Sequence, residues 1–474
     1  MKKRARLLAL LMALVMVVAM FAACGGEEDP ATTTTAATTD ATTTAATTPA
    51  GPNLQGYNFE IVNGNRILPQ TNEDGSYTNS DQEEFAEKLE ELQTRLGITI
   101  TNVPMPEGDQ IEVMISAAMG QVKLGDIIYS DSDYFFSVAN AGGLRPMDDQ
   151  AMIDAGLNLA DATRWYQPVT KLTNLLGHTW GLGVASKYIT VQTGYFVAFN
   201  KDLCAAAGYP DMYQLVRDGE WTWEVYRDVA RQATKDTDGD GTPDIWGTGA
   251  TAWGEEALTN GAQYVDEVDG KWVVTIDSEA GVEALQFLYD MNYGDQTRWD
   301  VSSGECRTAF ANGTIAFNWC SMGHIDGPNS AIYPAIHDYG ILPMPKGPRA
   351  TEYISAQDYV RAIIMQAANQ NVAETVAILN EYALIANHTS NFVDMLNDGR
   401  CRTEEDYEMM VTYIIPNLYR NNMAISEGID LWVDDNDMGG GLINDVSYNG
   451  MTPQQAIETN KDMIQAALDE FFKQ

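Results

Sequence analysis

The chain has 474 residues, and its 67 acidic side chains outnumber its 28 Lys and Arg side chains, giving a formal net charge of −39. Such acidity argues against a nucleic-acid partner, because binding nucleic acid requires cationic surface that displaces counterions. The chain is too long for one hydrophobic core. Beyond its N-terminus it has no apolar run long enough to span a bilayer, which argues against a permease.

The N-terminus has the pattern of an export signal. Four cations among the first six residues precede an apolar stretch from Leu7 to Ala23, and small residues stand before Cys24. We therefore expect residues 1–23 to be a signal peptide. A cysteine at the cut site is similar to a bacterial lipoprotein lipobox and predicts lipidation of Cys24, which would hold the protein on the extracellular face of the cell membrane. The alternative is a plain secretory signal cut near the same place.

The composition of residues 24–53 predicts a disordered stalk between the lipid and the folded body. The segment from Ala31 to Ala50 is almost wholly Thr and Ala, without apolar periodicity. Such a segment buries too little surface to offset the entropy of ordering it. A lipid, a tether and a folded body together are typical of a receptor or enzyme displayed at a cell surface.

Strands and helices alternate in the first part of the folded body. Residues 57–62, 98–103 and 126–129 read as strands, and a helix between the first two begins with a capping box at Ser80 and Glu83. This order predicts an α/β fold with a parallel, doubly wound sheet. Because ligands bind at the carboxyl ends of such strands, the turns at 63–66 and 130–133 are candidate pocket edges.

Further elements follow along the chain. Residues 195–199, 315–319 and 339–343 read as strands. Helices are expected after Thr222, over 371–386, and after Thr452, where Pro453 takes the first helical position.

The most specific local motif is an acidic loop that matches the first part of a calcium-binding loop. Oxygen ligands on alternate residues can wrap one Ca²⁺, and Gly241 permits the sharp turn. Gly247 stands where an EF-hand has its bidentate Glu, so the loop alone would leave the coordination shell of the ion incomplete. The alternative is an acidic surface turn. The candidate metal ligands are Asp236, Asp238, Asp240, Thr242 and Asp244.

Aromatic residues are the second signal, since a sugar ring packs its C–H faces on flat aromatic side chains. Of ten tryptophans, Trp253 and Trp319 stand among small and polar residues beside expected strands, and we predict that they line a pocket. No P-loop, nucleophile elbow or zinc-protease motif is present. Four cysteines beyond Cys24 could pair or remain as buried thiols: Cys204, Cys306, Cys320 and Cys401.

An ordered set of segments resembles the extracellular solute-binding proteins of ABC sugar importers (family 1). The resemblance rests on residues 199–203, 207–210, 221–224, 236–247, 310–317 and 339–347. It implies a two-lobe periplasmic-binding-protein-like fold of type II, whose lobes are joined by a multi-strand hinge. By analogy lobe 1 comprises residues 54–185 and 338–366, and lobe 2 comprises 186–337 and 367–474.

The resemblance also implies ligand contacts from both lobes. Lobe 1 would contribute Asn65, Arg66, Ser130, Asp131 and Asp133; lobe 2 would contribute Trp253 and Trp319; and Asp358 would lie near the hinge. The alternative interpretation is that these polar residues lie in loops exposed to solvent and bind no ligand.

We therefore hypothesise a monomeric, non-enzymatic receptor that captures a sugar, expected to be an oligosaccharide, in a cleft and delivers it to an ABC permease. We expect such a receptor to require no cofactor, and Ca²⁺ is a candidate structural ion for the acidic loop. A surface-tethered glycosidase or polysaccharide lyase is the alternative, because glycoside hydrolysis needs only two carboxylates. A receptor of the same fold for peptides or another solute is the third hypothesis.

Overall fold

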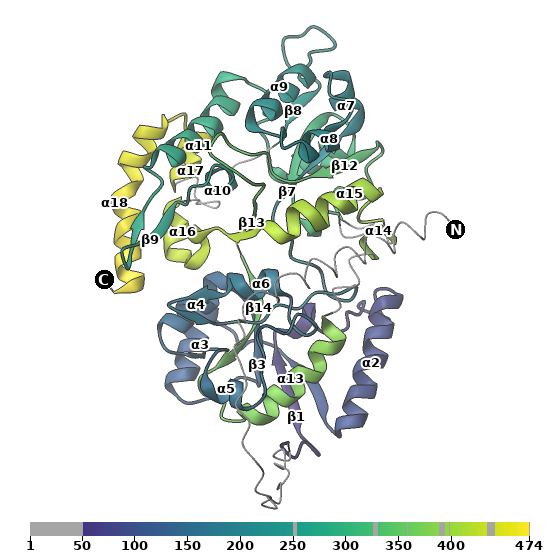
Figure 1. Ribbon diagram of the computed structural model, residues 1–474, viewed down its shortest axis with the longest axis vertical. Coiled ribbons are helices and arrows are strands. Elements are labelled where there is room, and N and C mark those ends of the chain that lie inside the picture. Colours follow the sequence, from purple (N-terminus) through teal and green to yellow (C-terminus); the bar gives the residue numbers. More distant parts are fainter. Residues whose placement is uncertain are drawn as a thin grey trace, which may run out of the picture. The chain divides into compact units, whose positions relative to one another are not determined.

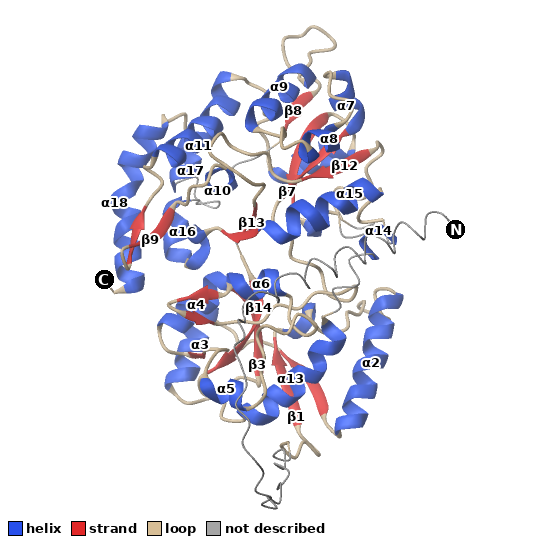
Figure 2. Cartoon of the chain, in the orientation of Figure 1, coloured by secondary structure: helices blue, strands red, loops and turns tan. Residues whose placement is uncertain are grey.

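Two main β-sheets, with helices packed around them, organise the chain (Figures 1 and 2). The structure is a computed structural model that describes residues 51–249, 254–325, 330–357, 359–387, 394–397, 399–433 and 441–473. Both sheets belong to the unit Gly51–Gln474. The predicted signal peptide, the stalk up to residue 50 and Cys24 lie outside the described residues. No helix of the described part combines the length and apolarity that crossing a bilayer requires.

The first sheet has the strand order β2-β1-β3-β14-β4. Its strands are β1 (Asn58–Val62), β2 (Thr99–Val103), β3 (Ile127–Asp131), β4 (Leu144–Arg145) and β14 (Arg361–Gln366). The first three are parallel, as the sequence predicts, whereas β14 runs antiparallel to both β3 and β4. The sheet is therefore mixed, because its fourth strand arrives from more than two hundred residues further along the chain.

Helices α2 (Ser80–Leu96) and α13 (Val372–Ala386) lie side by side although they are far apart in sequence (Figure 1). They share an apolar cluster with Phe59 and Ile61 of β1. The N-cap of α2 is Asn79, whose side-chain oxygen accepts from the Gln82 amide at 3.0 Å, so the cap lies one residue before the predicted cap at Ser80. Gly97 ends α2 in the left-handed conformation that the sequence predicts.

The second sheet has the order β12-β7-β11-β8. Its strands are β7 (Phe196–Asn200), β8 (Trp246–Thr248), β11 (Ile315–Cys320) and β12 (Tyr339–Leu342). Every residue of β7 is buried, which fits the apolar run that predicted it. Helices α9 (Trp223–Ala233) and α18 (Pro453–Phe472) start at the predicted caps Thr222 and Thr452.

The remaining elements complete the two lobes. Around the first sheet lie α3 (Gln110–Met119), α4 (Ser132–Asn140), α5 (Gln150–Asp154) and α6 (Gln167–Leu172), with the small pair β5 (Asn174–Leu175) and β6 (His178–Thr179). The second part contains α7 (Lys201–Ala206), α8 (Met212–Arg217), α10 (Glu255–Thr259), β9 (Val265–Val268), β10 (Lys271–Val274), α11 (Glu279–Tyr289), α12 (Ser303–Ala311), α14 (Asp394–Asn397), α15 (Glu404–Glu408), α16 (Glu427–Val433) and α17 (Gly441–Ser447).

Two segments differ from the predicted lobe boundaries. Residues 339–342 were expected in lobe 1, but β12 pairs with β7 of the second sheet. Residues 372–386 were expected in lobe 2, but α13 packs on α2 and α5 of the first. The reason is that a strand or helix joins the sheet whose apolar face it completes, and sequence order alone does not reveal that face.

Two connecting segments, residues 193–195 and 355–357, run between the two sheets along the chain, and residues 418–420 pair with the second of them to form a three-segment junction. The Tyr195 amide donates to the Ala356 carbonyl at 2.8 Å, and the Ser355 hydroxyl lies 2.7 Å from the carbonyl oxygens of both Thr193 and Tyr195. β13 (Ser355–Gln357) pairs in parallel with β15 (Leu418–Arg420). The junction thus has the multi-strand character expected of a hinge.

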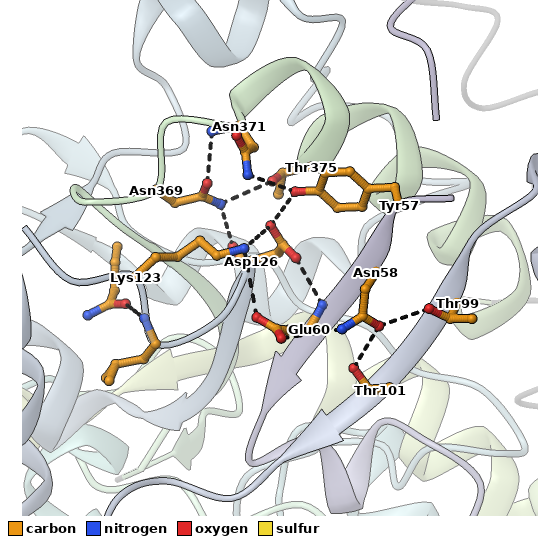
Figure 3. A network of polar contacts seen from close by, with 12 residues as sticks. Tyr57, Asn58, Glu60, Thr99, Thr101, Lys123, Asp126, Asn369, Asn371 and Thr375 are labelled. Atoms are coloured by element: carbon orange, nitrogen blue, oxygen red, sulfur yellow. Dashed lines mark hydrogen bonds and ion pairs between the residues drawn. The ribbon is translucent and has the colours of Figure 1, made fainter. Parts of the chain in front are cut away.

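A polar network holds the amino ends of β1 and β3, and its centre is the fully buried carboxylate of Asp126 (Figure 3). This carboxylate accepts from the Tyr57 hydroxyl at 2.6 Å and the Glu60 amide at 2.9 Å, and it pairs with Lys123 Nζ at 2.9 Å. Asn369 adds a hydrogen bond to the Asp126 carbonyl at 2.9 Å. Burial and the neighbouring Asp126 carboxylate raise the pKa of Tyr57, which therefore remains a donor.

Asp126→Ala is expected to lower the free energy of unfolding by roughly 2–6 kcal/mol, because the part-buried Tyr57 hydroxyl and Glu60 amide lose their shared acceptor at about 1–3 kcal/mol each. Urea denaturation checks this. The control is Glu381→Gln, which breaks the exposed 2.7 Å ion pair between Glu381 and Arg95 and should cost less than about 1 kcal/mol. Equal effects of the two variants would show that the network contributes no more than a surface pair.

Candidate functional site

A cavity of about 910 Å³ lies where residues near both main sheets approach each other. Its volume is within the range of about 300–1,000 Å³ that is typical of small-molecule sites. The wall combines residues 65–66, 68–71, 189–194 and 321–323 with individual residues from further elements. The individual residues are Thr78, Asn102, Tyr129, Ser330, Gln357 and Arg361.

The loop after β1 supplies Asn65 and Arg66 on a short 3-10 helix, Gly64–Arg66. Asn63 precedes it in the left-handed conformation, with φ of 56°. Asn102, at the end of the neighbouring strand β2, accepts from the Gly64 amide at 2.8 Å and donates to the Asn65 side chain. The loop is therefore fixed by the sheet beneath it, and it presents Asn65 and Arg66 at the carboxyl end of β1, as the sequence predicts.

Residues 189–194, which lead into β7, form a second part of the wall. The Gln192 side chain binds the backbone of Arg361 with both of its polar atoms, accepting from the amide at 2.8 Å and donating to the carbonyl at 2.7 Å. The Gln357 side chain accepts from the Gly194 amide at 3.1 Å and donates to the Tyr359 carbonyl at 2.9 Å. These two amides thus fix the wall where the connecting segments meet.

Arg361 begins β14 and lies opposite Asp131 in the strand register. Its Nε is 2.7 Å from Asp131 Oδ1, so the guanidinium is held as an ion pair at the edge of the cavity. Burial raises the pKa of Asp131, and the nearby charges of Arg361 and Arg66 oppose that rise. The carboxylate therefore positions Arg361 rather than presenting its own charge to a ligand.

The turn after β11 supplies Ser321, Met322 and Gly323. His324 Nδ1 accepts from the Ser321 amide at 3.1 Å and so fixes this turn. Burial, with Arg307 nearby, lowers the pKa of His324 to about 4. The imidazole is therefore neutral near pH 7, which leaves Nδ1 able to accept this hydrogen bond.

The structure brings together two of the predicted ligand residues, Asn65 and Arg66, in the cavity wall. Asp131 contributes through Arg361. Ser130 and Asp133 are buried, the first within β3 and the second in the first turn of α4. Neither is among the described residues that line the cavity. Their binding roles remain predictions.

Trp319 is placed in the apolar interior instead of the cavity wall. Its side chain is 2% exposed, and its indole N–H donates to the Tyr226 hydroxyl at 3.1 Å. Phe317, two residues earlier on β11, stacks on the same Tyr226 ring. The alternation of a strand puts Phe317 and Trp319 on the same face, so the cavity begins only at the following turn. Trp253 and Asp358 lie outside the described residues.

Sequence reasoning missed Gln192, Gln357 and Arg361 as wall residues. Arg361 lies three residues after the predicted Asp358, but no local motif marks any of the three wall residues. Their proximity comes from the junction and from the pairing of β14 with β3. Only knowledge of the strand order could have identified them.

The acidic loop brings three of its predicted ligands together. Oxygens of Asp236, Asp238 and Asp244 lie within 4.8 Å of one another, and all three residues are exposed. Asp236 accepts from the Gly239 and Gly241 amides at 2.6 and 2.8 Å, which lowers its pKa. Asp240 accepts from the amide of Thr242 at 2.7 Å. Hydrogen bonds within the loop therefore already occupy several of the predicted ligand oxygens.

The cysteines of the described part are buried thiols, which fits one of the two alternatives from the sequence: Cys204, Cys306, Cys320 and Cys401. Burial raises the pKa of Cys204 and Cys320. These two thiols therefore remain protonated near pH 7.

An α/β chain with two sheets, a multi-strand junction and a polar cavity lined from both sides has the architecture of a solute-binding protein. The sequence profile described as bacterial extracellular solute-binding protein matches residues 74–383. The chain belongs to this family.

Solved structures share the fold at low sequence identity. UgpB from Mycobacterium tuberculosis, in complex with glycerophosphocholine, is 16% identical with a TM-score of 0.58, covering 87% of this chain and 98% of that one. UspC from M. tuberculosis is 15% identical with a TM-score of 0.60, covering 86% and 100%. The cyclic alpha-maltosyl-1,6-maltose binding protein from Arthrobacter globiformis is 12% identical with a TM-score of 0.59, covering 88% and 100%. These similarities support the two-lobe, periplasmic-binding-protein-like fold.

Proposed function

We propose that this chain is an extracellular receptor that captures a carbohydrate in the cavity and delivers it to a membrane permease. The observation that carries the proposal is the cavity wall, which combines hydroxyl, amide and guanidinium groups from segments near both sheets. Such groups match the hydroxyl rim of a sugar. Family membership supports a binding role, and solved proteins of similar fold include a cyclic alpha-maltosyl-1,6-maltose binding protein and a maltodextrin-binding domain bound to maltotriose.

The wall also favours binding over hydrolysis. Among the described residues that line the cavity, none is Asp or Glu, and the adjacent Asp131 is engaged by Arg361. Glycoside hydrolysis in its usual form requires a pair of carboxyl groups flanking the scissile bond. The alternative of a tethered glycosidase would need such a pair at this cavity.

A thermal-shift panel of saccharides, peptides and polyols tests the proposal, because a ligand that binds only the folded state raises its stability by mass action. We expect a saccharide to stabilise the protein and to be recovered unchanged by mass spectrometry. Stabilisation by peptides alone would instead identify a peptide receptor. Shortened saccharides in the recovered ligand would identify an enzyme.

We propose that Cys24 carries the membrane anchor. Its position after an apolar signal and before a Thr/Ala-rich segment supports this. Expressed in a bacterial host, the protein should fractionate with membranes and incorporate labelled fatty acid. Cys24→Ser should do neither, and its fractionation with membranes in unchanged amount would contradict the anchor.

We propose Ca²⁺ as the ion for the acidic loop, on the basis of the three converging carboxylates. The melting temperature should be higher in Ca²⁺ than in chelator, by the equivalent of about 2.7 kcal/mol at a hundredfold excess over Kd. Asp236→Asn should abolish the difference, whereas Asp211→Asn, which changes a helix-capping carboxylate elsewhere, should retain it. A wild-type melting temperature that is identical in Ca²⁺ and chelator would refute the proposal.

A further inference from the structure

We propose that the captured saccharide carries an acidic group, a carboxylate or a phosphate, that binds at Arg66. This inference rests on the proposed function and specifies its ligand class. The charge of the described cavity wall is opposite in sign to that of the chain. Acidic residues outnumber Lys and Arg by 67 to 28 in the chain, yet the charged residues of the described cavity wall are Arg66 and Arg361.

The guanidinium of Arg66 is uncommitted in the described part of the chain. No hydrogen bond or ion pair there involves its side chain, and the residue is exposed at the cavity. Arg361 differs, because Asp131 pairs with its Nε at 2.7 Å. The two arginines and one carboxylate leave one net positive charge, and Arg66 is the group that can offer it to a ligand.

Three amide side chains of the wall are committed inside the protein. The side-chain oxygens of Asn102, Gln192 and Gln357 already accept from the amides of Gly64, Arg361 and Gly194. Their NH2 groups donate to Asn65, Arg361 and Tyr359 in the same way, whereas no hydrogen bond or ion pair among the described residues involves the Arg66 side chain, which carries five N–H donors. A ligand rich in acceptors complements such a surface better than a neutral polyol does.

A guanidinium binds a carboxylate or phosphate through two parallel hydrogen bonds, which makes it the side chain best suited to an acidic ligand. The rest of the protein opposes that ligand, because a formal charge of −39 repels anions at long range. A local cation is therefore required before an acidic saccharide can bind. A uronate and a sugar phosphate would satisfy the same chemistry.

Isothermal titration with matched pairs tests the inference: galactose with galacturonate, cellobiose with cellobionate, and glucose with glucose phosphate. At least one acidic member should bind ten or more times more tightly than its neutral partner, with an affinity that falls as salt rises. The first two pairs report a carboxylate and the third a phosphate, so the pattern also identifies the acidic group.

Arg66→Gln should weaken the preferred acidic ligand at least tenfold and its neutral partner less than twofold. Arg66→Lys should retain part of the preference, because it keeps the charge but loses the planar fork. Arg95→Gln is the control, since it removes an exposed arginine of the same lobe that pairs with Glu381 on a helix surface. Circular dichroism establishes that each variant is folded.

Tight binding of neutral saccharides with no acidic preference would overturn the inference and leave the proposed function intact. The same holds if Arg66→Gln weakens both members of a pair equally. Binding of no saccharide of either kind, in these pairs or in the wider panel, would overturn both.

Discussion

Gly194→Ala is expected to lower the free energy of unfolding by roughly 2–4 kcal/mol and to weaken ligand binding at least tenfold. Gly194 has a φ of 69°, and a Cβ atom there would lie 2.5 Å from the Ala356 carbonyl oxygen and 2.6 Å from the Ser355 hydroxyl. The backbone must shift to relieve these contacts. That shift moves the junction and the Gln192–Gly194 part of the cavity wall together.

Gly142→Ala is the matched control for this prediction. Gly142 has a similar φ of 75°, but no atom lies within 4 Å of the Cβ that the substitution would add. It should therefore cost only the strain of the left-handed conformation, about 1–2 kcal/mol, and leave affinity unchanged. Chemical denaturation and calorimetric titration measure both effects. If the two variants were equally stable and bound ligand equally well, the crowding at Gly194 would have no energetic role.

Asp406→Ala is expected to cost roughly 2–6 kcal/mol, because it leaves two buried donors without an acceptor at about 1–3 kcal/mol each. Asp406 is fully buried, and its Oδ1 accepts from the Tyr213 hydroxyl at 2.6 Å and the Ile341 amide at 2.8 Å. These bonds tie α15 to α8 and β12. Asp406→Asn retains one acceptor oxygen and should cost less than Asp406→Ala in urea denaturation at pH 7.

Asp406 also gives a pH dependence whose sign follows from its environment. Burial raises the pKa of the Asp406 carboxyl in the folded protein, although hydrogen bonds from Tyr213 and Ile341 oppose the rise. The folded state therefore holds this proton more tightly than the unfolded state, so ionisation costs stability as pH rises through the interval above the unfolded pKa of about 3.9. The stability of Asp406→Asn relative to wild type should increase over that interval. A relative stability that falls with pH would show that the folded pKa is lowered instead.

Local sequence patterns predicted individual elements well. The strands β1, β2, β7 and β11 and the caps of α9 and α18 depend on periodicity and on side chains within a few residues, which the sequence displays directly. The cap of α2 was displaced by one residue because Asn79 and Ser80 are both good caps, and the Asn79 side chain makes the bond.

Long-range relations were predicted less well, for a physical reason. Asn65 and Arg66 were identified because they follow a strand directly, but the positions of Arg361 and Gln192 depend on a strand pairing formed across the chain. Trp319 was misplaced as a cavity residue because its polar neighbours in sequence are not its neighbours in space. Its ring follows the alternation of β11 into the interior, where Tyr226 and Phe317 surround it.

Hydrogen–deuterium exchange, with and without the saccharide that most stabilises the protein, tests most directly whether a solute is captured between segments from both sides of the cavity. We expect the ligand to slow exchange in the segments 65–71, 189–194 and 321–323, since all three contribute to the wall of one cavity. Protection restricted to one of these segments, or located elsewhere in the chain, would contradict this expectation.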